Sequence, residues 1–144
     1  MTSRLLATAL AAAMLPGCSN GAASGPVPEP PATVLAPAER APWGDTVAAR
    51  VGGLAAHIHD QLHNRHGTVR ETPYVARNPA AAAGLRAWYR ERLGEEWTPK
   101  PLSLPPEEHG FAFAAGDRAL AVGWLDPLPD GRVPAITMRY GEPR

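Results

Sequence analysis

The stretch Phe111–Trp124, FAFAAGDRALAVGW, carries the pattern that decides the fold most clearly. On each side of Gly116-Asp117, large apolar side chains alternate with Ala or Gly, with the period of two that is typical of β-strands. A two-residue turn at Gly116-Asp117 would place Phe113 opposite Leu120 and would carry the same register along both strands. Every large side chain would then lie on one face of the hairpin and every small one on the other. We therefore expect a β-hairpin over this stretch.

Neighbouring segments predict the rest of the sheet. The segment Val133–Tyr140 alternates in the same way and predicts a third strand, with its large side chains on the same face as those of the hairpin, namely Ile136, Met138 and Tyr140. The segment Trp97–Leu104 predicts an edge strand, because an edge position tolerates its two prolines. The segment Thr68–Ala76 has a weaker pattern and is interpreted as a strand or an extended crossover.

Two helices are expected before the hairpin. Asp45 or Thr46 can cap a helix that ends near Arg65, with an apolar stripe on one side. Asn78-Pro79 combines a cap residue with proline at the first helical position, and this predicts a second helix that ends near Leu93. Together the patterns predict an α+β domain with two helices packed on one face of a three- to four-stranded antiparallel sheet, after a disordered Pro-rich tether.

The N-terminus has the features of an export signal. After Arg4 comes an apolar run of about eleven residues, the length of the apolar core of a signal peptide, and then the sequence Leu15-Pro16-Gly17-Cys18. This motif resembles the lipobox of bacterial lipoproteins, in which the Cys thiol is alkylated by a diacylglyceryl group and the Cys becomes the new N-terminus. The resemblance implies a signal peptide over residues 1–17 and a lipidated Cys18. An ordinary secretory peptide cut near Ala22 is the alternative.

The residues after Cys18 predict the location and the organisation of the mature chain. Ser19 stands where an Asp would retain a lipoprotein of enteric bacteria in the inner membrane, so the resemblance implies an outer-membrane lipoprotein that faces the periplasm. The segment 18–42 is rich in Pro and Ala and predicts a linker, which in extended form would reach on the order of 70 Å. The segment 43–144 is then expected to form one small α+β domain.

The residue inventory excludes several classes of function. The 144 residues carry 14 basic and 14 acidic side chains, and this balance argues against a nucleic-acid partner. Cys18 is the only cysteine, and lipidation would consume its thiol. Ser103 is the only serine after residue 42, and it lacks the Gly-x-Ser-x-Gly context of an exposed nucleophile. We therefore expect a protein that is not an enzyme and that binds no organic cofactor.

A cluster of histidines on the first helix is the strongest candidate for a site. At about 100° per residue, His59, His63 and His66 lie on one side of the helix. The first two have the i,i+4 spacing by which a helix presents two imidazoles to one Zn or Cu ion. Further ligands from the sheet would be His109, Glu107 or Glu108. The alternatives are a row of surface histidines at the end of a helix, where the helix dipole favours positive charge, and a pH-sensitive contact.

These observations predict an anchored protein that works by contact. We expect a non-catalytic interaction or assembly module of the cell envelope, held in the lipid bilayer by Cys18 and bound to another envelope protein. The alternatives are a metal-binding envelope protein and an immunity or inhibitor lipoprotein. The expected contact surfaces are an edge strand and the small-residue face of the hairpin, formed by Ala112, Ala114, Ala119 and Ala121.

Two further features have a functional and a plain interpretation. The loop 126–131, which is rich in Pro and Asp, is either a recognition loop or a stiff connector. Arg86 and Arg90 lie one turn apart on the second helix, and a solvated face is the expected environment for them.

Overall fold

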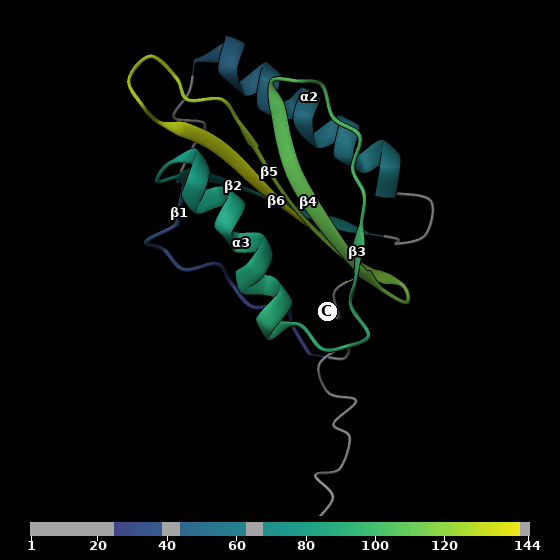
Figure 1. The fold of residues 1–144 in the computed structure, drawn as a ribbon. Coiled ribbons are helices and arrows are strands. Elements are labelled where there is room, and N and C mark those ends of the chain that lie inside the picture. Colours follow the sequence, from purple (N-terminus) through teal and green to yellow (C-terminus); the bar gives the residue numbers. More distant parts are fainter. Residues whose placement is uncertain (1–24, 39–43, 63–67, 142–144) are drawn as a thin grey trace, which may run out of the picture.

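The computed structural model describes residues 25–38, 44–62 and 68–141, which form a single six-stranded antiparallel sheet with one long helix on each face (Figure 1). The strands lie in the order β1-β2-β6-β5-β4-β3. Their bounds, with those of the helices, are β1 Leu35–Pro37, α2 Asp45–Leu62, β2 Val69–Ala76, α3 Pro79–Arg92, β3 Thr98–Lys100, β4 Glu108–Ala115, β5 Arg118–Leu125 and β6 Val133–Tyr140.

The expected arrangement of the fold is wrong in two respects, although the α+β class remains. The sheet has six strands rather than three or four, because β1 and β2 extend it beyond β6. The two helices lie on opposite faces rather than on one. The buried side chains of α2 pack with Ala112 and Ala121, whereas those of α3 pack with Phe113 and Val122. The molecule therefore has three layers, with the sheet between the helices.

The hairpin of β4 and β5 has the predicted register. Phe113 lies opposite Leu120, Phe111 lies opposite Val122, and Ala115 and Arg118 flank the turn. Gly116 has φ +59°, and no residue other than Gly has a positive φ in the described part of the chain. A glycine with positive φ at the first central position is what a type II′ turn requires. The turn is confirmed together with the two faces that it produces.

The predicted orientation of β6 is wrong, because its large side chains lie on the opposite face of the sheet from those of the hairpin. In the pairing of β5 with β6, Met138 lies opposite Ala121 and Ile136 lies opposite Gly123. Residues directly opposite each other in an antiparallel pair share a face, so the large side chains of β6 stand beside the small ones of β5. This combination fills the layer beneath α2. The alternation within β6 was correct, but nothing local to the strand fixes which face it turns to its neighbour.

Helix α2 packs closely on the small-residue face. Its buried side chains include Leu54 and Ile58, both fully buried, and they lie over Gly123. A Cβ atom added to Gly123 would come within 2.8 Å of Ile58 Cδ1, so the absence of a side chain there lets the helix approach. The prediction that the Ala face of the hairpin receives a partner is wrong, because α2 itself covers that face.

In the Pro-rich segment that was expected to be a disordered tether, residues 25–38 are folded. We call residues 25–38 the strap. Val27 and Leu35 are 4% and 0% exposed, and β1 pairs with the end of β2. Arg77 donates its backbone N–H to the carbonyl of Val34 at 2.9 Å. The strap therefore belongs to the folded domain and is not part of a disordered tether.

The start of α3 is the predicted one. The side chain of Asn78 accepts a hydrogen bond from the backbone N–H of Ala81 at 2.7 Å, and Pro79 occupies the first turn. This satisfies one of the amide groups that every helix leaves unpaired at its N-terminus. The inward residues of α3 are Ala82, Leu85 and Tyr89.

No helix among the described residues is both long enough and apolar enough to cross a membrane.

Candidate functional site

A cluster of polar side chains lies between α3, the sheet and the strap. Arg139 on β6 is 4% exposed, and its Nη1 lies 3.0 Å from Oε1 of Glu29 in the strap. The hydroxyl of Tyr74 on β2 donates to the other oxygen of the same carboxylate at 3.0 Å. Burial, and to a lesser degree the Glu29 carboxylate, raise the pKa of Tyr74. One carboxylate thus joins the strap to the two neighbouring strands β2 and β6.

A second contact fixes the strap to the helix above it. The hydroxyl of Tyr89 on α3 donates to the carbonyl of Pro28 at 3.0 Å, and burial raises the pKa of this tyrosine. Tyr89 is fully buried, with its ring near those of Trp88 and Phe111. The strap therefore enters the fold beside the C-terminal half of α3. Its composition gave no signal of this, since Pro28 and Glu29 lie in a run of prolines.

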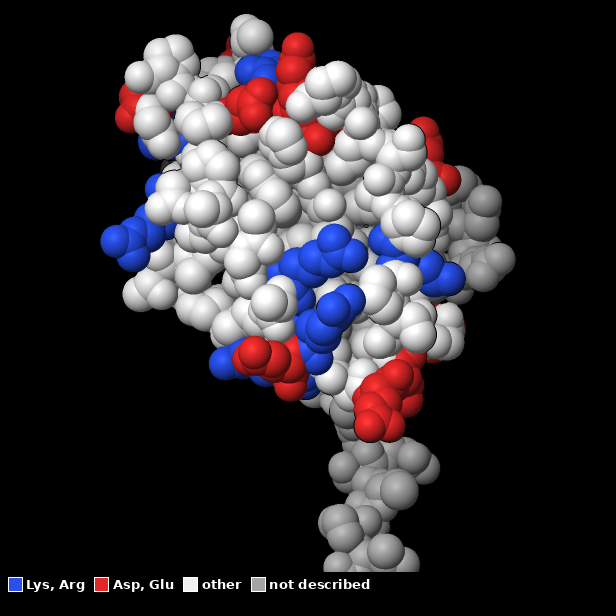
Figure 2. Space-filling model, viewed as in Figure 1, with Lys and Arg blue, Asp and Glu red and all other residues white. Residues whose placement is uncertain are grey.

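The outer flank of α3 presents a basic surface. A shallow hollow of about 250 Å³ is lined by Ala83, Arg86, Ala87 and Arg90. Basic side chains gather on this face of the molecule, over α3 and toward β3 (Figure 2). Among the described residues no carboxylate forms an ion pair with Arg86 or Arg90, whereas Arg92 on the same helix lies 3.6 Å from Glu91 and over the ring of Trp88. We call the four lining residues the α3 basic face. The expected solvated surface for the two arginines is confirmed.

Only one of the three histidines of the predicted metal site lies among the described residues. His59 Nδ1 is 3.2 Å from the hydroxyl of Tyr140, and the two rings stack with their centroids 5.9 Å apart. Burial raises the pKa of Tyr140 to about 12. His63 and His66 lie outside the described residues. Within the described ranges no three side chains of His, Cys, Asp or Glu come together as a metal site would need.

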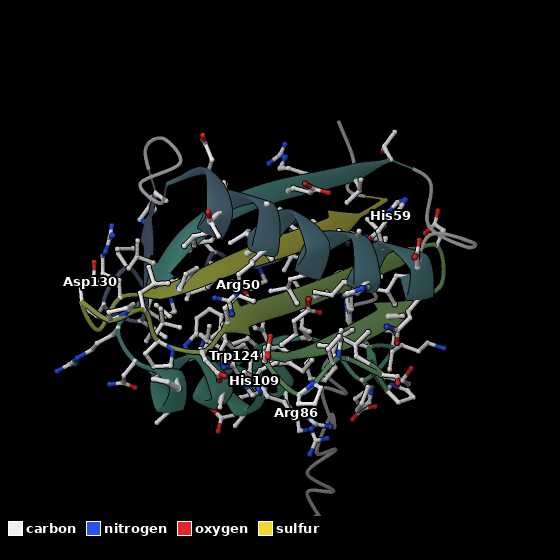
Figure 3. The ribbon with its side chains drawn as sticks, turned by 90° about the horizontal axis from the view of Figure 1, so that it is seen from above. Arg50, His59, Arg86, His109, Trp124 and Asp130 are labelled. Atoms are coloured by element: carbon white, nitrogen blue, oxygen red, sulfur yellow. The ribbon has the colours of Figure 1, made fainter. Side chains whose placement is uncertain are left out.

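The sheet residues expected to complete the metal site are engaged elsewhere. Glu108 accepts from Nδ1 of His57 at 2.7 Å, so it meets a different histidine of α2. His109 turns to the other face of the sheet, where its Nε2 lies 2.7 Å from Oδ1 of Asp126 and its ring stacks on Trp124 (Figure 3). His109 and His59 therefore lie on opposite sides of the sheet, which excludes His109 from the three further ligands suggested for the site. Glu107 is exposed.

The loop 126–131 is held by its own hydrogen bonds. The backbone N–H of Leu128 donates to the carbonyl of Arg132, and the N–H of Gly131 donates back to Leu128, both at 2.8 Å. The carboxylate of Asp130 accepts from the backbone N–H and from Nε of Arg132, and these bonds hold its pKa below the usual range. Leu128 is only partly exposed. The geometry favours the stiff connector over a recognition loop.

The last two residues considered in the sequence are Ser103 and Cys18. Ser103 lies in the segment between β3 and β4, where both its backbone N–H and its carbonyl bond to the side-chain amide of Gln61 at 2.7 and 2.8 Å. These bonds fasten the segment to α2. Cys18 lies outside the described residues.

Comparison of the chain with known protein families, curated proteins and solved structures finds no match.

Proposed function

We propose that this protein is a lipid-anchored protein of the cell envelope that acts without catalysis, by holding its folded domain against another envelope component. The observation that carries the proposal is the packed strap. Because the strap belongs to the fold from residue 25, only the six residues 19–24 separate it from Cys18.

The strap sets an upper limit on the distance between the anchor and the domain. From Cys18 to Gly25 there are seven residue steps, which span at most roughly 25 Å even when fully extended. A domain on so short a connection works beside the membrane that anchors it. This favours a role at the bilayer surface over one that needs a long reach across the periplasm.

The available surface also supports a contact function. The small-residue face lies under α2, and the two edge strands β1 and β3 have only three residues each. Short edges are poor templates for an added strand. The contact with another envelope component is therefore left to the exposed helix and loop surfaces rather than to the sheet.

Fractionation of the native envelope tests the anchor. The full-length protein is expected in the membrane fraction and to incorporate labelled palmitate, because acylation of Cys18 supplies stable membrane affinity. The variant Cys18→Ser is expected to lose both the label and the membrane fraction. Recovery of unlabelled wild-type protein in the soluble fraction would contradict the proposal.

Crosslinking from the same membranes tests the contact. We expect a crosslinked species with the wild-type chain that is lost with Cys18→Ser, because the anchor holds the domain beside its partner. Equal crosslinking of the wild-type and Cys18→Ser chains would contradict the proposal, and so would the absence of any crosslinked species.

A further inference from the structure

We propose that the α3 basic face rests on the bilayer that holds the anchor, with Arg86 and Arg90 bound to anionic lipid phosphates. The inference depends on the proposed function, because it takes the acyl chains on Cys18 as the source of membrane proximity. It adds the orientation of the domain and the chemistry of the surface that it touches.

The first argument is the position of the strap entry. The hydroxyl of Tyr89 donates a hydrogen bond to the carbonyl of Pro28, and Tyr89 is the residue immediately before Arg90. The point at which the chain enters the fold therefore lies beside the last turns of α3. Pro28 is ten residue steps from Cys18, a span of at most about 36 Å, so this end of α3 stays nearer the membrane than α2, which is separated from it by the thickness of the sheet (Figure 1).

The second argument is charge. Arg86 and Arg90 are exposed and have no carboxylate partner among the described residues, and the nearest acidic side chain along the helix, Glu91, lies beside Arg92. In Figure 3, Arg86 lies on the far side of the sheet from α2 and His59. Guanidinium groups bind phosphate oxygens with paired hydrogen bonds, so two of them with free donors suit a phospholipid headgroup.

The third argument is the shape between the two arginines. Ala83 and Ala87 line the floor of the hollow, and both are exposed. Because their side chains are single methyl groups, a phosphate can come close to the helix and meet both guanidinium groups together. A basic side chain at an anionic surface changes the binding constant roughly fivefold, so two act weakly alone but suffice to orient a domain that is already anchored.

The experiment uses the acylated full-length protein, purified from its envelope and reconstituted into vesicles. Because acylation occupies Cys18, the variant Ala87→Cys has a single free thiol in the hollow for a fluorophore. The matched variant Ala56→Cys places the same label on the exposed side of α2. The vesicles contain phosphatidylethanolamine with phosphatidylglycerol, or phosphatidylcholine alone, and each set carries a headgroup quencher.

We expect the label at residue 87 to be quenched only in the phosphatidylglycerol vesicles, and the label at residue 56 to be unquenched in both. High salt should reverse the quenching, since it screens exposed charges. Combining Ala87→Cys with Arg86→Gln and Arg90→Gln should lower the ratio of membrane-facing to other orientations by about an order of magnitude or more. Adding Arg50→Gln instead should leave it unchanged.

The contrary outcomes separate this inference from the proposed function. Protein that stays in the vesicles but shows no quenching at residue 87 overturns the orientation and leaves the anchor. A label at residue 87 that is shielded in native envelopes but not in vesicles means that the α3 basic face binds a protein, and this also overturns the inference. Protein that carries no acyl chain and leaves the vesicles overturns both proposals.

Discussion

The two faces of the sheet are covered in different ways. On the α2 side, β4 and β5 contribute only small residues at the centre, and the hydrophobic cluster there has one polar group, the hydroxyl of Tyr140, which lies beside His59. On the α3 side the same strands contribute Phe, Leu, Val and Trp, and the buried set also includes Arg118, Thr137 and Arg139. The α2 side of the sheet is therefore covered by its helix alone. The α3 side is covered by α3 and the strap together.

The difference shows how side-chain size decides what a layer needs. Small residues let a helix approach the strands, and the side chains of α2 fill the remaining space. Large residues hold a helix farther away, and the space at its sides must be closed by another segment. In this chain the strap closes it and also brings Glu29 to the buried Arg139.

The largest expected effect is the loss of the fold when a charge is placed on the α2 side. Ala121 is fully buried beneath α2, so Ala121→Arg should cost more than about 4 kcal/mol, through overpacking and an unpaired buried charge. Thermal unfolding followed by circular dichroism measures this. The matched variant Ala87→Arg on the exposed side of α3 should unfold like the wild type. A stable Ala121→Arg chain would mean that α2 does not cover this face.

Alkaline pH should destabilise the protein through tyrosines on both sides. Folding raises the pKa of all three, Tyr74, Tyr89 and Tyr140, the last to about 12 from the usual 10. The unfolded chain loses these protons first, so stability is complete below about pH 10 and falls as pH rises toward 12. For Tyr140 alone the loss is about 2–3 kcal/mol. Urea unfolding at several pH values, with tyrosinate absorbance, measures it.

The tyrosine prediction has a clear control. Tyr140→Phe should make the free energy of unfolding less dependent on pH, because it removes the contribution of this tyrosine. The contributions of Tyr74 and Tyr89 on the α3 side should remain. Tyrosinate that forms completely near pH 10 in protein that is still folded would contradict the burial described above.

The same substitution should have opposite signs on the two sides. Gly123→Ala pushes a methyl group toward Ile58 and Leu54, so α2 must shift, at a cost of about 1–3 kcal/mol. Gly84→Ala lies on the exposed side of α3 with nothing within 4 Å, and should stabilise the helix by about 1 kcal/mol. Chemical denaturation of both variants tests the pair. If both substitutions destabilise the protein, or both stabilise it, the two sides do not differ in packing as described.

The smallest expected effect concerns the ion pair of the strap. Glu29→Gln removes the charge opposite Arg139 but keeps an acceptor for Tyr74, and because Glu29 is 68% exposed the loss should be only about 1 kcal/mol. We also expect faster exchange of the backbone amide hydrogens in β1, because the strap is held less firmly. Glu91→Gln, which affects the exposed pair with Arg92, should change neither stability nor exchange. If both variants behave alike, the strap does not depend on its carboxylate.

Prediction from sequence succeeded where the information is local. Alternation over Phe111–Trp124 with a Gly-Asp turn specifies one register, and the cap at Asn78 specifies one helix start. It failed where partners lie far apart in the chain. The strap is rich in proline, and only contacts such as those of Leu35 with β2 and Glu29 with Arg139 show that it folds.

The candidate site was partly visible in the sequence for the same reason. Arg86 and Arg90 could be placed on one side of α3 from their spacing, because a helix has a fixed period. Their position beside the strap could not be predicted, because it depends on a hydrogen bond from Tyr89 to a carbonyl 61 residues earlier. The histidines show the converse: spacing grouped His59 with two neighbours, but the sheet turns His109 to the opposite face.

The position of β6 has a consequence for the order in which the molecule is made. β6 follows the other five described strands in the chain, yet it lies between β2 and β5 and joins the strap side of the sheet to the hairpin side. Until Val133–Tyr140 emerges, the nascent chain holds two incomplete sheets with no bonds between them. Truncation before Val133 should therefore leave no stable domain.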